Sequence, residues 1–160
     1  MTYGMLASAS RPRASFAYHL ARDSWLDSVV TKARVDLPRT AEAPRIARRC
    51  VQHEVGAELD HPEREIVEIM ITELVSNAVR HAGSDGGENV ILHFAVAPER
   101  IRVEVCDRGA GFTADKLTEP RSGPGGYGLL MVDRGASRWG ASGEDGNCVW
   151  FELDRRVTGG

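Results

Sequence analysis

The chain has 160 residues, of which 42% are hydrophobic and 27% are charged, and its formal net charge is −3. This length and composition are typical of one soluble globular domain that buries a core without disulfides or structural metals. The weakly acidic balance and the absence of a Lys/Arg run argue against direct binding to nucleic acid or to a membrane surface, and no stretch is long and apolar enough to span a membrane.

The cysteines and the first residues indicate a cellular compartment. Cys50, Cys106 and Cys148 are odd in number, widely spaced and without a CxxC pair. This pattern favours reduced thiols over a disulfide framework or a zinc site. The start of the chain has no uninterrupted apolar core, so it does not resemble a signal peptide. We therefore expect a cytoplasmic protein.

The chain is expected to consist of an N-terminal tail (1–28, with a short helix around 16–26), one domain (29–156) and a C-terminal tail (157–160). The elements of the domain follow from hydrophobic periodicity and from turn-forming residues. In chain order they are a strand at 29–37, a helix at 40–59, a helix at 60–81, strands at 90–97 and 100–106, a short helix at 128–135, and strands at 137–142 and 148–153.

This order of elements predicts an α/β fold. Asp60 is a credible N-cap of the second helix and Pro62 an early helical residue. Helices and strands in this succession predict a two-layer α/β sandwich, with a mixed, mostly antiparallel sheet and helices on one face.

The second helix contains "ELVSNAVRHA", which places Glu73 and Asn77 four residues apart and therefore on one helix face. Ile66, Ile69 and Met70 should share that face, and they are core-forming residues. A buried polar group without a partner costs about 1–3 kcal/mol. Glu73 and Asn77 therefore find partners inside the protein or face a ligand; the alternative is a surface-facing pair on a tilted helix.

The strand at 100–106 runs into "CDRGAGF". Asp107 leaves the strand where side chains escape sheet packing, and a carboxylate there can accept a hydrogen bond from an exocyclic amine such as that of adenine. Gly109 and Gly111 allow the backbone to approach a flat ligand or to take positive φ. A plain Asp-Gly turn is the alternative interpretation of this motif.

The third motif is "SGPGGYGLLMV", a glycine-rich loop that opens an apolar helix. Such loops present backbone N–H groups and the positive end of the helix dipole to anions, usually phosphate. The motif is neither a Walker loop, because no Gly-Lys-Ser/Thr follows, nor a dinucleotide fingerprint, because no strand leads directly into it. A flexible linker before a helix is the alternative.

In this order, the three motifs resemble the Bergerat-type ATP-binding fold of gyrase, Hsp90, histidine kinases and MutL. Within that superfamily, "ELVSNAVRHA", "DRGAGF", "GGYGLLMVDRGASRWG" and "GNCVWFEL" are most similar to the bacterial anti-sigma-factor serine kinases. The resemblance covers roughly residues 29–156.

The resemblance implies roles for individual residues. Glu73 would act as general base toward a serine hydroxyl, Asn77 would supply an oxygen to Mg²⁺, and Asp107 would bind the adenine amine. The other residues that it places around ATP are Arg80, His81, Gly109, Gly111, Phe112, Gly125, Gly126, Tyr127, Gly128, Leu129 and Cys148.

Two of these residues depart from the family pattern. Tyr127 stands where the family often has a small basic residue. Cys148 stands where the family tends to have threonine, and a thiol is a poorer hydrogen-bond donor than a hydroxyl.

The implied function is that of an anti-sigma-factor serine/threonine protein kinase that uses ATP and Mg²⁺. It would bind a sigma factor, phosphorylate a serine on an anti-sigma-factor antagonist, and form a homodimer. The alternative is an ATP-binding regulatory module of the same fold, which controls a partner through lid conformation without phosphoryl transfer. A stand-alone ATPase is less favoured, because nothing in the chain supplies a second domain to drive.

Overall fold

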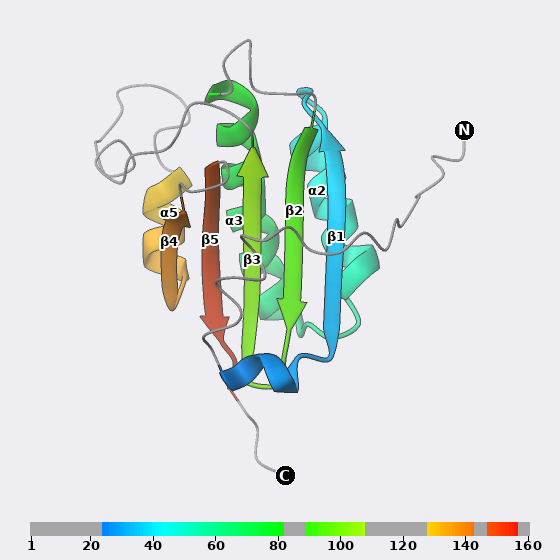
Figure 1. The fold of residues 1–160 in the computed structure, drawn as a ribbon, viewed down its shortest axis with the longest axis vertical. Coiled ribbons are helices and arrows are strands. Elements are labelled where there is room, and N and C mark those ends of the chain that lie inside the picture. The colour runs from blue at the N-terminus through cyan, green and yellow to red at the C-terminus, as the bar shows by residue number, and fades with distance from the viewer. Residues whose placement is uncertain (1–23, 82–88, 108–127, 143–146, 157–160) are drawn as a thin grey trace.

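A computed structural model of the chain describes residues 24–81, 89–107, 128–142 and 147–156 (Figure 1). The short element η1 is a 3₁₀ helix and η2 is a π-helical turn. In chain order the elements are η1 (Ser24–Ser28), β1 (Thr31–Pro38), α2 (Ala43–Cys50), η2 (Val51–Val55), α3 (His61–His81), β2 (Asn89–Val96), β3 (Arg100–Asp107), α5 (Gly128–Gly135), β4 (Arg138–Ser142) and β5 (Asn147–Asp154).

The described strands form one five-stranded sheet in the order β1-β2-β3-β5-β4, and each neighbouring pair is antiparallel. The helices α2 and α3 cover one face of this sheet, and α5 packs beside α3 (Figure 1). The predicted two-layer α/β sandwich is therefore confirmed. β1 pairs with β2 alone among the described strands, so it is an edge strand of the sheet. The homodimer expected from the resemblance stays a prediction.

The core lies between the helices and the sheet. Alternate residues of a strand point to the same face, so each central strand contributes every second side chain to this core. Phe94 of β2, Val103 of β3 and Phe151 of β5 are fully buried on the helix side. On α3, the buried residues recur at the spacing of one helix face. They are Val67, Met70, Ile71, Leu74, Val75 and Ala78.

The start of α3 confirms the predicted cap. The backbone N–H of Glu63 donates to Asp60 Oδ1 at 2.8 Å, and the backbone N–H of Asp60 donates to Glu63 Oε2 at 2.9 Å. This reciprocal pair satisfies two otherwise unpaired helix-end donors. Arg155 then donates to both carboxylate oxygens of Glu63, at 2.9 and 3.0 Å, and so ties the end of β5 to the start of α3.

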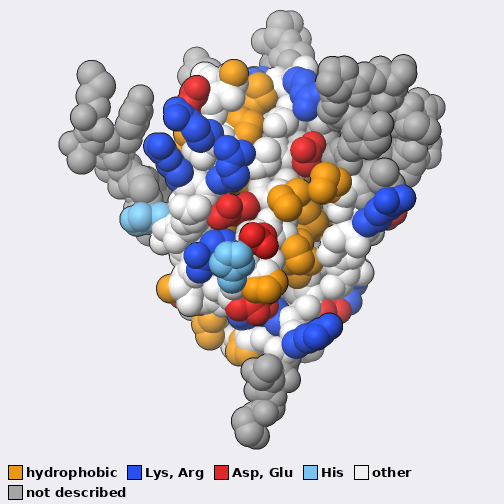
Figure 2. All heavy atoms as spheres, turned by 180° about the vertical axis from the view of Figure 1, so that it is seen from behind, with side chains coloured by type: hydrophobic (Ala, Val, Ile, Leu, Met, Phe, Trp, Pro, Cys, Tyr) orange, Lys and Arg blue, Asp and Glu red, His pale blue; other side chains and the backbone are white. Residues whose placement is uncertain are grey.

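Two details of the helices differ from the prediction. The helix expected at 40–59 ends as an α-helix at Cys50 and continues as the π-turn η2, which keeps both Val51 and Val55 buried. Ile66 and Ile69, predicted to belong to the core, are 40% and 46% exposed. The stripe from Val67 to Ala78 faces the sheet instead, because it lies about one residue further round the helix. Figure 2 shows hydrophobic side chains at the surface of this helical face.

The opposite face of the sheet carries a buried polar row. Glu152 of β5 accepts from Arg102 of β3 at 2.7 Å and from Arg138 of β4 at 2.9 Å. Arg102 also lies over the ring of Trp150, 4.2 Å from its centroid. A Cβ at Gly140 would lie 2.8 Å from that ring, so only glycine fits beside Trp150 on β4.

The prediction that the cysteines are reduced thiols without a disulfide is wrong for two of them. Cys106 and Cys148 form a disulfide between β3 and β5, whereas Cys50 is free and buried. The two cysteines are 42 residues apart in the sequence, and only the pairing of β3 with β5 places them directly opposite each other. No helix in the described ranges is long and apolar enough to cross a membrane.

Candidate functional site

Glu73 and Asn77 lie on the flank of α3 that faces α5. A Cβ at Gly135 of α5 would lie 3.5 Å from Met70 Sδ and 3.9 Å from Ile66 Cγ2, which places that flank beside α5. Glu73 follows Ile66 by two turns, and Asn77 lies one turn further on. Both side chains are partly buried.

These two polar side chains have no partner in the part of the chain that the structure describes. Glu73 forms no ion pair or side-chain hydrogen bond there, and neither does the amide of Asn77. A partly buried carboxylate and amide in this condition retain their capacity for hydrogen bonds and for a hard cation. Of the two alternatives, the structure therefore favours side chains that face a ligand over side chains whose hydrogen bonds are made by other described residues.

Asp107 approaches the same region from the sheet. It is the last residue of β3, and it alternates with the core residues Val103 and Val105, so its side chain lies on the helix side. It is 6% exposed. The end of β3 and the C-terminal part of α3 lie at the same end of the molecule (Figure 1), and α3 contacts β3. The fold thus brings Asp107, Glu73 and Asn77 to one end of the α/β interface.

The remaining predicted site residues have different positions. Arg80 is exposed on the last turn of α3, and His81 is the last residue of that helix. Gly128 is the first residue of α5 and Leu129 follows it. The predicted residues outside the described ranges are Gly109, Gly111, Phe112, Gly125, Gly126 and Tyr127.

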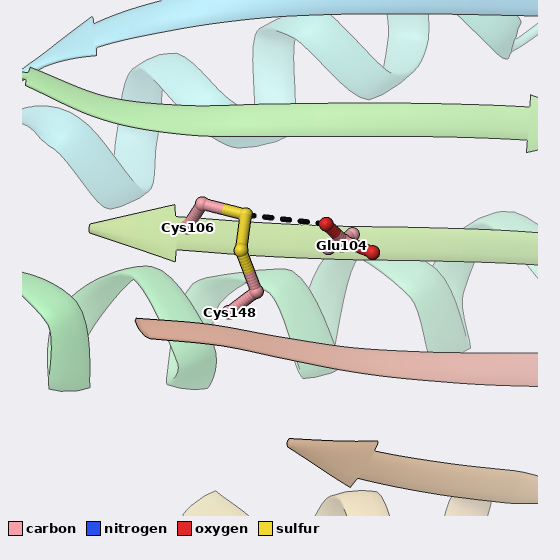
Figure 3. A group of neighbouring side chains, drawn as sticks. All are labelled: Glu104, Cys106 and Cys148. Carbon is pink, nitrogen blue, oxygen red and sulfur yellow. Dashed lines mark hydrogen bonds between the residues drawn. A yellow bond between two sulfur atoms is a disulfide. The ribbon is translucent and has the colours of Figure 1, made fainter. Parts of the chain in front are cut away.

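Cys148 lies on β5 beside the proposed adenine end of the site, but its sulfur is bonded to Cys106. Both cysteines alternate with core residues, so the disulfide lies on the face of the sheet away from α3. Glu104 reaches the same disulfide, with Oε1 3.3 Å from Cys106 Sγ (Figure 3). Sequence motifs missed this group, and only the register that pairs Cys106 with Cys148 reveals it.

The comparisons with known proteins agree with this architecture. The family model of the histidine kinase-like ATPase domain matches residues 34–153. A solved structure of the RsbU and RsbW domains of Rv1364c from Mycobacterium tuberculosis is similar, with 22% sequence identity and a TM-score of 0.59. The match covers 76% of this chain and 31% of the mycobacterial chain, so this chain spans about a third of that protein.

A second solved structure is the histidine kinase domain of a blue-light activated histidine kinase from Erythrobacter litoralis EL346. It is 26% identical with a TM-score of 0.43, over 56% of this chain and 43% of that chain. A search of the curated proteins found no significant match. The family model spans most of the sheet and both long helical segments, from β1 to β5, and the chain therefore belongs to the family of histidine kinase-like ATPase domains.

Proposed function

We propose that this chain is an anti-sigma-factor serine/threonine protein kinase. It would bind ATP and Mg²⁺ at the end of the α/β interface and transfer the γ-phosphoryl group to a serine of an antagonist protein, and it would bind a sigma factor. The observation that carries the proposal is that Glu73 and Asn77 on α3 are partly buried without a side-chain partner among the described residues, at the end of the α/β interface where the buried Asp107 also lies. Membership of an ATPase-domain family supports ATP as the ligand.

The residues at this end of the fold suit the chemistry. Phosphoryl transfer depends on positioning and charge neutralisation more than on covalent steps. Mg²⁺ prefers oxygen ligands and keeps several waters, so its ligands would be one amide oxygen from Asn77 together with phosphate and water oxygens. Glu73, one turn away, would accept the proton of the incoming serine hydroxyl. Asp107 would select adenine through its amine.

Replacing Asp107 with asparagine is expected to weaken ADP binding about 10- to 100-fold. The amide is a weaker acceptor than the carboxylate, and a hydrogen bond to a charged group contributes about 1.5–3 kcal/mol. Isothermal titration calorimetry measures the effect. Asp154→Asn is the matched control, because Asp154 is exposed at the other end of β5; unchanged ADP affinity in Asp107→Asn would remove Asp107 from the base pocket.

Replacing Asn77 with alanine is expected to abolish the Mg²⁺-dependence of ATP binding. The change removes a metal-ligand oxygen but preserves α3, because alanine is the better helix former. ATP titrations with and without Mg²⁺, with a thermal melt, check the result. Asn89→Ala, at the exposed first residue of β2, is the control. An Asn77→Ala variant that binds ATP with undiminished Mg²⁺-dependence would contradict the ligand assignment.

The alternative function is a nucleotide-gated binding module that holds ATP without transferring phosphate. The carboxylate of Glu73 favours the kinase, because a binding module needs no base at that position. Incubation of the chain with labelled ATP and candidate antagonist proteins separates the two. Phosphoserine on an antagonist supports the kinase, whereas ATP binding without any labelled antagonist supports the module.

A further inference from the structure

Glu104, Cys106 and Cys148 form a compact group on the face of the sheet away from the helices (Figure 3). Cys106 and Cys148 are directly paired on β3 and β5, with their Cα atoms 4.0 Å apart. Glu104 lies two residues before Cys106 on the same face of β3. One ligand atom from each of the three residues lies within 4.8 Å of the other two.

The carboxyl group of Glu104 is buried but incompletely hydrogen-bonded by the described residues. Glu104 is 1% exposed, and its Oε2 has no hydrogen bond within the described residues. Arg102 Nη2 lies 3.6 Å from Oε2, an ion-pair distance too long for a hydrogen bond. The buried His93 of β2 is the other described titratable group that faces Glu104, because the two residues are paired across the sheet. Burial raises the pKa of Glu104, although Arg102 opposes the shift.

The direction of the hydrogen bond between Glu104 and Cys106 depends on whether Cys106 is a thiol or part of the disulfide. A disulfide sulfur carries no hydrogen, so the 3.3 Å contact is a hydrogen bond only when the carboxyl group is protonated and donates. In the reduced pair, the Cys106 S–H donates to the carboxylate instead. One proton therefore passes between Glu104 and Cys106 as the disulfide forms or opens.

We propose that Glu104, Cys106 and Cys148 form a reversible redox centre, with Cys106 as the nucleophile and Glu104 as its base. Cys106 is the more exposed of the two cysteines, because it is partly exposed whereas Cys148 is 4% exposed. An incoming oxidant therefore reaches Cys106 first. The oxidant class is a small-molecule disulfide.

Oxidation of the cysteine pair takes two thiol–disulfide exchanges. Glu104 takes the proton of Cys106, and the thiolate attacks the small disulfide, forming a mixed disulfide and releasing one small thiolate. Cys148 then loses its proton to solvent and attacks Cys106 Sγ, forming the Cys106–Cys148 bond and releasing the second small thiolate. The cysteine pair loses two electrons, the small disulfide gains them, and Glu104 ends protonated against Cys106 Sγ. A dithiol reverses the sequence.

The centre adjoins the proposed nucleotide site through the backbone. Cys106 precedes Asp107, and Cys148 follows Asn147, the residue paired with Asp107. Disulfide formation therefore holds β3 and β5 together at the end of the sheet where Asp107 lies. The redox chemistry itself does not require that a nucleotide binds there.

The test is oxidation of the reduced full chain by oxidised glutathione, quenched with an alkylating reagent and followed by mass spectrometry. Wild-type protein should lose two alkylation sites together, Cys106 and Cys148, and regain both with dithiothreitol; Cys50 should remain alkylatable after denaturation. Cys148→Ser should stop at a glutathione adduct on Cys106. A pair that never forms reversibly, or an adduct confined to other cysteines, would overturn the proposal.

The role of Glu104 is tested by Glu104→Gln, with Glu65→Gln on the exposed face of α3 as the control. At pH 7 an ordinary thiol is only a few per cent thiolate, so loss of the base should slow oxidation about tenfold. Above the ordinary thiol pKa of about 8.5 the difference should vanish. Equal rates and equal pH profiles in wild type and Glu104→Gln would overturn the role of Glu104. If Glu104→Gln does not fold, the wild-type profile decides, because oxidation that follows a single ionisation near 8.5 contradicts an assisting base.

Discussion

Replacing Glu152 with alanine is expected to lower the free energy of unfolding by about 3–5 kcal/mol, the usual cost of removing one partner from a buried ion pair. Glu152 is 3% exposed, and Arg102, its closest partner, is 2% exposed. Their atoms Oε1 and Nη1 are 2.7 Å apart, and Arg138 and Arg100 approach the other oxygen at 2.9 and 3.4 Å. Without the carboxylate, the contacts that the buried Arg102 retains among the described residues are the longer one with Glu104 and the one with the ring of Trp150.

Urea unfolding followed by circular dichroism measures this loss. Asp154→Ala is the matched control, because Asp154 also pairs with Arg138 but its side chain is 52% exposed; an exposed pair contributes about 0–1 kcal/mol. A double variant, Arg102→Met with Glu152→Leu, should recover part of the loss, because it removes both members of the closest buried ion pair. Recovery should be incomplete, because the buried Glu104 loses its ion-pair contact with Arg102. Equal losses of unfolding free energy in Glu152→Ala and Asp154→Ala would show that the ion pairs of Glu152 are as solvated as those of Asp154.

Local patterns were sufficient to predict most of the architecture. Alternation predicted the strands at 90–97 and 100–106 to within one residue of β2 and β3, and Asp60 with Pro62 marked the start of α3 within one residue. The orientation of α3 was harder to predict. Ile66 and Ile69 fit an apolar stripe on α3 as well as Val67 and Ile71 do, and only the position of the sheet decides between the two stripes.

The disulfide required information that no local pattern contains. Cys106 and Cys148 lie on strands that are neighbours in the sheet but separated by α5 and β4 in the chain. Pairing of β3 with β5, in a register that sets Asp107 opposite Asn147, is a property of the whole sheet. A one-residue slip in that register would turn one cysteine toward the core and the other away.

For the candidate site, sequence spacing predicted the relation between Glu73 and Asn77, because an i, i+4 pair is local. The approach of Asp107 to the same end of the molecule followed only from the resemblance, since it depends on how β3 packs against α3. The glycine-rich segment at 122–127 lies outside the described residues, and its role over the phosphates stays a prediction.

Replacing Glu73 with glutamine is expected to slow phosphorylation of the antagonist about 10²–10⁴-fold, the usual contribution of a positioned general base. Glutamine keeps the shape of the side chain and most of its hydrogen-bonding capacity, but it cannot accept the proton of the serine hydroxyl. ATP binding and sigma-factor binding should persist, because neither involves proton transfer. The variant would therefore hold its sigma factor and its nucleotide while leaving the antagonist unmodified.

Single-turnover transfer of labelled phosphate to the antagonist measures the rate, and calorimetry measures ATP affinity in parallel. Glu65→Gln, two turns earlier and exposed on α3, should transfer at the wild-type rate. Equal transfer rates in wild type and Glu73→Gln would show that another group accepts the proton. If ATP binds normally but wild-type protein phosphorylates no antagonist, the kinase proposal fails and Glu73 becomes a residue that organises water around the nucleotide. The two results are distinguishable because ATP affinity is measured on the same samples.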